Sequence, residues 1–190
     1  MERFDLTDTQ AEAILELKET DFKNLFAEDI NKKKEFVRDV EIETDIEMMI
    51  PDNYITNIQE RLSIYTELNN LKNEAEITAF KGKLLDRFGK MPNPVLEIFN
   101  GLRLRWLCKE LGFERIILKN RKLRCYFISN PQSFFYQSNV FQNMLSYVGK
   151  KADRKLTFKR SNKYFILVKD DCKGIRHAEL LLTEIRDAIT

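Results

Sequence analysis

Histidine and cysteine, two side chains often used for metal binding and nucleophilic chemistry, are scarce in this chain of 190 residues. His177 is the only histidine, and Cys108, Cys125 and Cys172 are widely spaced within apolar segments. A structural zinc site needs closely spaced ligands, and the chain has neither a CxxC pair nor a second histidine. The cysteines are therefore predicted to be reduced thiols in or near the core, and no metal is expected.

Patterns for phosphate binding and acid–base catalysis are also missing from the sequence. The pair Gly82-Lys83 lacks the upstream glycine and the following Ser or Thr of a P-loop. Asp170-Asp171 lies just before Gly174 and a predicted helix, where carboxylates more often form a turn or a cap than a catalytic pair. The sequence predicts no enzyme activity and no cofactor in this chain.

Charge is distributed unevenly along the chain. Residues 1–100 carry 13 Lys and Arg against 22 Asp and Glu, whereas residues 101–190 carry 19 against 8. Many of the basic side chains flank two predicted hairpins that also contain aromatic residues, which is a pattern found in sheets that bind nucleic acid. The candidate nucleic-acid contacts are Lys122, Arg124, Lys159, Arg160 and Lys163. A solvated sheet face with basic edges gives the same pattern and is the preferred interpretation.

The composition indicates a folded protein without a membrane span. Hydrophobic residues make up 43% of the chain, with 14 Phe but only 6 Gly and 4 Pro, which argues against disorder. No apolar run approaches the roughly 20 residues that cross a bilayer, and the acidic N-terminus does not resemble a signal peptide. We expect a cytoplasmic protein with no membrane contact.

Two segments are expected along the chain. Residues 1–49 are predicted to hold an N-terminal helix at 6–18, a charged linker at 29–35 and an extended edge segment at 37–46. Residues 50–190 are predicted to form a single α+β domain.

The first part of that domain is predicted to contain three helices, over about 57–72, 73–88 and 94–111. Gly89 would end the second helix in a left-handed conformation, and Pro94 suits the first turn of the third. The third helix is apolar over a wide arc, so it is expected to contact neighbours on two sides. The predicted buried side chains are Ile58, Leu62, Tyr65, Leu68 and Leu71, then Ile77, Phe80, Leu84, Leu85 and Phe88, then Val95, Ile98, Phe99, Leu102, Trp106, Leu107 and Leu111.

Beyond Gly112 the apolar period falls to two, which is typical of strands. One hairpin is predicted over 115–128 with its turn at Asn120-Arg121, and a second over 155–168 with its turn at Ser161-Asn162. Helices are expected over 132–148 and 175–189. The predicted fold class is α+β, with a three-helix N-terminal half packed against a ββα-ββα half that contains two antiparallel hairpins.

Several of these segments carry a family resemblance. They are Ile50-Pro51-Asp52-Asn53-Tyr54-Ile55, Arg61-Leu62-Ser63-Ile64-Tyr65, Leu85-Asp86-Arg87-Phe88-Gly89 with Pro92, Leu102-Arg103-Leu104-Arg105 and Leu111-Gly112. In order and spacing the chain resembles the C-terminal domain of bacterial transcription-repair coupling factors, the Mfd family. The resemblance covers about residues 19–190 and is most specific over 50–112.

This resemblance implies a regulatory role. In that family the whole protein is an ATP-driven translocase on double-stranded DNA that displaces stalled RNA polymerase and recruits the repair protein UvrA. Its motor, which uses ATP and Mg²⁺, and its polymerase-binding modules would lie upstream of this chain. The resemblance implies that the C-terminal domain is non-catalytic. It would pack on the N-terminal UvrB-like module of the same protein, mask the UvrA-binding surface and restrain the motor.

The same resemblance points to an interface. In the family, acidic side chains ahead of the Arg-Phe-Gly corner contact basic residues of the partner module. Asp86 matches such a position, whereas Lys83 stands where the family often has Glu. The interface candidates are Asp86, Arg87, Lys83, Lys90 and Asn93. The alternative function is a stand-alone, basic α+β module that binds nucleic acid.

Overall fold

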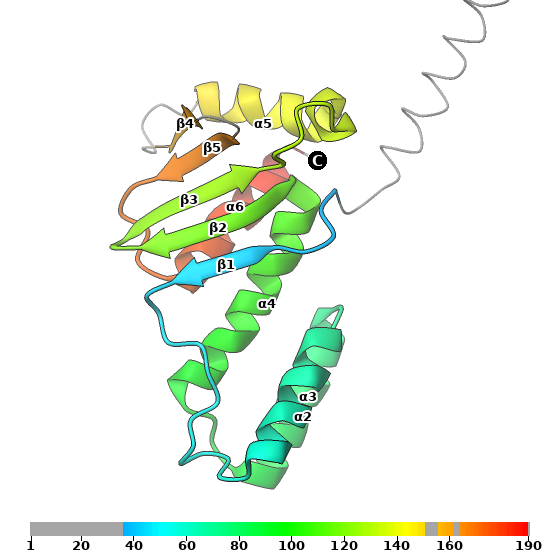
Figure 1. Ribbon diagram of the computed structural model, residues 1–190, viewed down its shortest axis with the longest axis vertical. Helices are drawn as coiled ribbons and strands as arrows, with labels where there is room; N and C mark the ends of the chain where they lie inside the picture. Colours follow the sequence, from blue (N-terminus) through cyan, green and yellow to red (C-terminus); the bar gives the residue numbers. More distant parts are fainter. Residues whose placement is uncertain (1–35, 151–155, 162–163, 190) are drawn as a thin grey trace, which may run out of the picture.

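The computed structural model describes residues 36–150, 156–161 and 164–189 (Figure 1). The helix predicted at 6–18 and the charged linker at 29–35 lie outside these ranges. The described residues form a helical half and a sheet half, joined by the long helix α4 (Asn93–Leu111) and by the segment that follows strand β1 (Glu41–Thr44). The predicted α+β class is confirmed. No helix within the described ranges combines the length and the apolar character needed to span a membrane.

Three helices build the helical half, as predicted: α2 (Ile58–Asn70), α3 (Glu74–Phe88) and the first part of α4. Asparagine caps begin the first two, because the side chains of Asn57 and Asn73 accept hydrogen bonds from backbone amides one turn later, at 3.1 and 2.9 Å. Gly89 ends α3 as predicted, but with φ 76° and ψ −157° it lies outside the left-handed helical conformation expected for it, whereas Gly112 ends α4 in that conformation with φ 76° and ψ 30°. Local signals in the sequence therefore set these boundaries.

Burial in the helical half differs from the prediction at three leucine or isoleucine positions. Ile58, Leu62 and Leu85 were expected in the core, but 63%, 55% and 54% of their surfaces are exposed. Helix α3 packs through the stripe of Ile77, Phe80 and Leu84, and Leu85 lies about 100° round the helix from Leu84, outside that stripe. The prediction was wrong here because α2 and α3 each bury only one narrow stripe, so the buried stripe is narrower than the apolar pattern.

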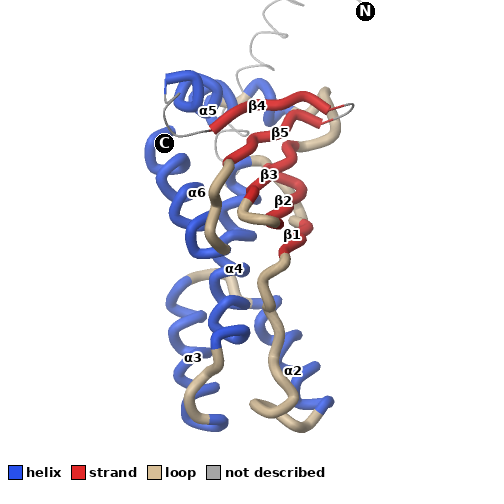
Figure 2. The backbone as a smooth tube through the Cα atoms, turned by 90° about the vertical axis from the view of Figure 1, so that its left-hand side faces the viewer, coloured by secondary structure: helices blue, strands red, loops and turns tan. Residues whose placement is uncertain are grey.

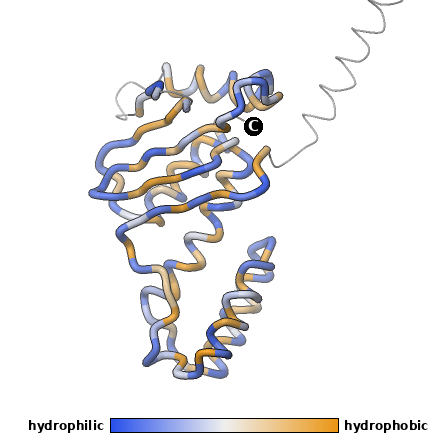
Figure 3. The backbone as a smooth tube through the Cα atoms, viewed as in Figure 1, coloured by the Kyte–Doolittle hydropathy of each residue, from blue (hydrophilic) through white to orange (hydrophobic). Residues whose placement is uncertain are grey.

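The sheet has five strands in the order β1-β2-β3-β5-β4. The first hairpin joins β2 (Phe113–Lys119) to β3 (Lys122–Phe127), and the second joins β4 (Leu156–Ser161) to β5 (Tyr164–Lys169). Asn120 and Arg121 have φ values of 52° and 56°, so the predicted tight turn is confirmed. Apolar and polar stretches alternate along the strands (Figure 3), as expected for a sheet with one covered face.

The extended segment predicted near residues 37–46 contributes the edge strand β1. This strand pairs with β2 in parallel, with Ile42 opposite Ile116. Residues 41–44 are thus part of the sheet, while the domain boundary at residue 50 stays a prediction.

One face of the sheet is covered by helices. Figure 2 shows α4, α5 (Asn139–Lys150) and α6 (Ile175–Ile189) on the same side of the strands. The single helix predicted at 132–148 is split into a 3₁₀ turn, η1 (Phe134–Gln137), and α5. Ser138 separates the two, because its hydroxyl donates to the carbonyl of Phe135 at 2.6 Å and accepts from the amide of Phe141. The predicted ββα-ββα order is confirmed.

Helix α4 belongs to two hydrophobic cores. Its first part, with Val95, Phe99 and Leu102, lies in the core of the helical half. Its second part lies in the core of the sheet half through Leu104, Leu107, Cys108 and Leu111. The predicted contacts on two sides are thereby confirmed, and they fall at opposite ends of the helix.

Candidate functional site

The corner between α3 and α4 is fixed by contacts to the preceding loop. The Tyr54 hydroxyl donates to the Gly89 carbonyl at 3.3 Å, and the rings of Tyr54 and Phe88 lie 5.9 Å apart between centroids. After Gly89 the chain runs through Pro92 into α4, with Pro94 in its first turn as predicted. The corner therefore has a defined shape, and the side chains on it are held in place by the helical core.

Two of the predicted interface residues are bonded within the chain. Lys83 contacts Glu67 of α2 with Nζ 2.6 Å from Oε2, and Arg87 forms an ion pair with Glu60, also on α2. Exposed pairs of this kind contribute little to stability, about 1 kcal/mol or less, but they orient both side chains toward α2. Neither cation projects freely from the corner.

The other three predicted residues are exposed. Asp86, Lys90 and Asn93 all lie on the surface of the corner. Asp86 is about 200° round α3 from the buried Leu84 and so points away from the core. Among the described residues Asp86 forms neither a hydrogen bond nor an ion pair. Its charge is thus available to a partner.

The sequence reasoning missed two exposed leucines near this corner. Leu85 is 54% exposed and adjoins Asp86, and Leu96 is 36% exposed on the second turn of α4. Leu85 was assigned to the core because it fits the apolar pattern, and only the positions of the neighbouring helices show that it is outside. Exposed apolar side chains beside a charge are a common feature of contact surfaces.

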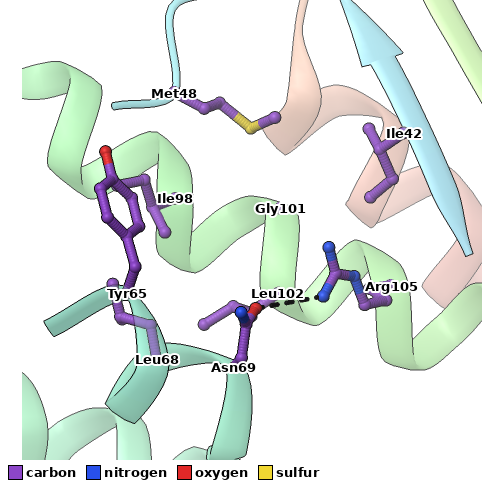
Figure 4. Close-up of a pocket in the computed structure, with 9 residues that line it drawn as sticks. All are labelled: Ile42, Met48, Tyr65, Leu68, Asn69, Ile98, Gly101, Leu102 and Arg105. Carbon is purple, nitrogen blue, oxygen red and sulfur yellow. Dashed lines mark hydrogen bonds between the residues drawn. The ribbon is translucent and has the colours of Figure 1, made fainter. Parts of the chain in front are cut away.

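A small cavity marks where the two halves meet (Figure 4). It has a volume of about 200 Å³ and lies between α2, α4 and the segment after β1. A Cβ on Gly101 would lie 3.0 Å from the sulfur of Met48, so the glycine allows the chain to pass close to α4. Arg105 donates weakly to Asn69 at 3.5 Å, and its buried Nε has no hydrogen-bond partner among the described residues.

Charged side chains of α3, α4 and α6 lie near one another where the two halves meet. Arg103 Nε donates to Glu74 Oε2 at 2.7 Å, and this hydrogen bond holds the pKa of the Glu74 carboxyl below its ordinary value. Nearby on α6, Arg176 pairs with the buried Glu179 at 2.8 Å. Burial lowers the pKa of Lys81, whose Nζ lies 4.8 Å from the centroid of the Phe99 ring. The Arg103–Glu74 pair thus ties α3 to α4, whereas the Arg176–Glu179 pair lies within α6.

The candidate nucleic-acid residues lie elsewhere, on the sheet. Lys122, Arg124 and Lys159 alternate with buried residues and so lie on the face away from the helices. Arg160 lies on the opposite face of β4 from Lys159, and Lys163 lies outside the described residues. The structure brings three of the five to one face, at a distance from the α3–α4 corner, and their role stays a prediction.

A family model described as the TRCF domain matches residues 44–138. Curated relatives that the chain resembles include transcription-repair-coupling factors. The protein from Escherichia coli strain K12 is 33% identical over 76 residues, and that from Rickettsia conorii is 32% identical over 75 residues; each alignment covers 40% of this chain and 7% of the relative. The protein from Myxococcus xanthus is 29% identical over 126 residues, covering 60% of this chain and 10% of the relative.

A solved structure is similar as well. The crystal structure of a C-terminal domain of transcription-repair coupling factor superposes with a TM-score of 0.57 at 20% identity, covering 79% of this chain and 96% of that one. At this identity the likeness establishes the fold. The chain thus spans only a small part of the length of its curated relatives, but nearly the whole of the solved domain.

Proposed function

This chain belongs to the TRCF domain family, and from that premise we propose that it is a non-catalytic regulatory domain of a transcription-repair coupling factor. In this role it packs against the N-terminal UvrB-like module of the same protein. The contact masks the surface that binds UvrA and restrains the ATP-driven motor that moves on double-stranded DNA and displaces stalled RNA polymerase. Other modules of the parent protein bind ATP, Mg²⁺, DNA and polymerase.

The observation that carries this proposal is the exposed, unpaired carboxylate of Asp86 beside the exposed side chain of Leu85. A basic partner surface would pair with the carboxylate, and the leucine would supply apolar contact area. Since the corner is held by Tyr54 and by the helical core, little conformational freedom is lost when the partner binds.

A contact of this kind suits reversible regulation. Interfaces between domains of one chain are usually modest in area and rather polar, so they open without unfolding either domain. A coupling free energy of about 1–3 kcal/mol changes the population of the closed state several-fold to about a hundred-fold. The free energy expected from one ionic and one apolar contact falls within that range.

Charge reversal in the full-length parent protein tests the proposal. We expect Asp86→Arg to open the clamp, so that UvrA binds more tightly and the basal ATPase rate rises, and Leu85→Asp to act in the same direction. Asp187→Arg on α6 is the matched control, because it makes the same change of charge at an exposed aspartate in the sheet half. We expect it to leave both readouts at the wild-type level.

Two outcomes of this experiment would contradict the proposal. If Asp86→Arg and Leu85→Asp both leave UvrA binding and ATPase unchanged, the corner is not the regulatory contact. If the control opens the clamp as strongly as Asp86→Arg does, overall charge rather than the corner controls the closed state.

A further inference from the structure

The face of the sheet opposite α4, α5 and α6 is not covered by any described element (Figures 1 and 2). Two cross-strand rows of side chains lie on it. One row runs from β2 to β4 through Arg115, Tyr126, Ile166 and Lys159, and the next runs through Ile117, Arg124, Val168 and Thr157. We call this surface the open sheet face.

The open sheet face has an apolar floor with aromatic rings. Ile166 and Val168 are 7% and 3% exposed, yet they belong to neither hydrophobic core, so the neighbouring side chains of this face cover them. Tyr126 and Tyr164 meet edge to face on neighbouring strands, with ring centroids 5.6 Å apart. The guanidinium of Arg115 lies 5.9 Å from the centroid of the Tyr126 ring. Planar groups are thus gathered near the middle of the sheet.

Positive charge on this face is compensated in two places, near β1 and at the hairpin end. Near β1, Arg115 and Lys119 pair with Glu43, and at the hairpin end Lys122 pairs with Asp170 at 2.8 Å. Strands β3, β4 and β5 contain no Asp or Glu. Arg124 and Lys159 form no ion pair within the described part of the chain, so the surplus charge lies on either side of the two tyrosines.

We propose that the open sheet face binds single-stranded nucleic acid, with Tyr126 and Tyr164 contacting unpaired bases and Arg124 and Lys159 contacting phosphates. Bases in a single strand are free to stack on aromatic rings presented by a sheet, and basic side chains beside the rings follow the backbone. A duplex fits less well. Its major groove, about 12 Å wide, admits a helix or a two-stranded ribbon, whereas this surface is the broad face of a five-stranded sheet.

Fluorescence anisotropy with labelled oligonucleotides tests this proposal on the 190-residue chain. The probes are deoxyuridine and uridine homopolymers of about 12 nucleotides, a length within the usual site size of such surfaces, and a duplex of the same length. We expect both single strands to bind more tightly than the duplex, with affinity falling steeply as salt rises. Comparing the two homopolymers distinguishes DNA from RNA as the preferred ligand.

Matched variants separate stacking from general electrostatic attraction. Tyr126→Leu and Tyr164→Leu remove a ring but keep a strand-compatible apolar side chain, and we expect each to weaken binding about five- to a hundred-fold. We expect Arg124→Ser with Lys159→Ser to weaken binding at least ten-fold and to reduce the salt dependence. The control is Lys72→Ser with Lys90→Ser, which removes two exposed positive charges from the helical half and should change affinity less than two-fold. Circular dichroism verifies that each variant is folded.

Four results with these oligonucleotides and variants would overturn the proposal. They are no binding of either single strand at low salt, tighter binding of the duplex, equal weakening by the control pair, and unchanged affinity in both tyrosine variants. Equal competition by poly-glutamate would also overturn it, since an acidic protein surface would then be the better ligand for the open sheet face.

Discussion

Arg103 of α4 and Glu74 of α3 form a two-point ion pair, in which Nε lies 2.7 Å from Oε2 and Nη2 bonds to Oε1. The pair joins the first turn of α3 to the middle of α4, next to the position where α4 passes from one core to the other. It therefore bears directly on how firmly α3 is held against α4.

This ion pair predicts a pH dependence of stability. The pKa of the Glu74 carboxyl is lowered from its ordinary value of 4.5 in the folded chain, so the unfolded chain takes up the proton first as the pH falls. The stabilisation is thus present at neutral pH and is lost as the pH falls below about 4.5 and through the lower folded-state pKa. We expect Arg103→Leu to reduce the loss of stability on acidification, by less than about 1 kcal/mol because the Glu74 side chain is 61% exposed.

Urea denaturation at a series of pH values measures the effect. In a Glu74→Gln background the same Arg103→Leu substitution should no longer alter the pH dependence. A difference that persists in that background would assign the effect to another group.

A second prediction concerns two glycines with different surroundings. Gly112 has φ 76°, and a Cβ at this position would overlap the ring of Phe135. We expect Gly112→Ala to destabilise the fold by about 2–4 kcal/mol, because it adds backbone strain to overpacking. Gly82 is the control, since it lies within α3 with nothing within 4 Å of its Cβ position. Gly82→Ala should stabilise by about 0.5–1 kcal/mol through helix propensity. Thermal denaturation of both variants measures the contrast, and equal effects would contradict it.

A third prediction follows from the two cores along α4. Phe99→Ala in the helical half should cost about 3–5 kcal/mol, and Leu104→Ala in the sheet half about 2–5 kcal/mol. Because one helix carries both side chains, we expect each variant to unfold in a single transition. Trp106 is the only tryptophan and packs on the helical core, so its fluorescence reports on that half, while far-ultraviolet circular dichroism reports on the whole chain. Separate midpoints for the two signals would show that the halves unfold independently.

A fourth prediction concerns thiol reactivity. Cys108, Cys125 and Cys172 are buried free thiols, as the sequence predicted, and burial raises the pKa of all three. Since the thiolate is the reactive form, we expect negligible reaction with Ellman's reagent in the folded chain at pH 8 and rapid reaction of three thiols in urea. Rapid labelling of one thiol in the folded chain would place that cysteine on a surface that opens easily. Cys172 is the one to examine first, because it lies on a loop.

Local signals explain which parts of the fold could be predicted. Asn57, Asn73 and Gly112 set helix ends, and Asn120-Arg121 sets the first hairpin, all through interactions within a few residues. The parallel pairing of β1 with β2 could not be predicted, because it joins residues more than 70 positions apart and has no local signal. The exposure of Leu85 was missed for a similar reason, since it depends on where the other helices lie.

The candidate site was likewise predictable only in part. The resemblance to a family, rather than any spacing of residues, directed attention to Asp86, and its exposure at a fixed corner agrees with the expected outward contact. The sequence offered no sign that Lys83 and Arg87 pair with glutamates of α2, because those ion pairs form only once two helices lie side by side. The interface itself stays a prediction until the clamp is tested in the parent protein.

Parallel pairing of neighbouring strands also has a topological consequence. Everything between β1 and β2 is one crossover connection, and α4 alone would suffice as its helix because its second part covers the sheet. Helices α2 and α3 lie within this connection, between β1 and α4, and pair with no strand. The corner is therefore carried by a part of the connection that the strand pairing itself does not require.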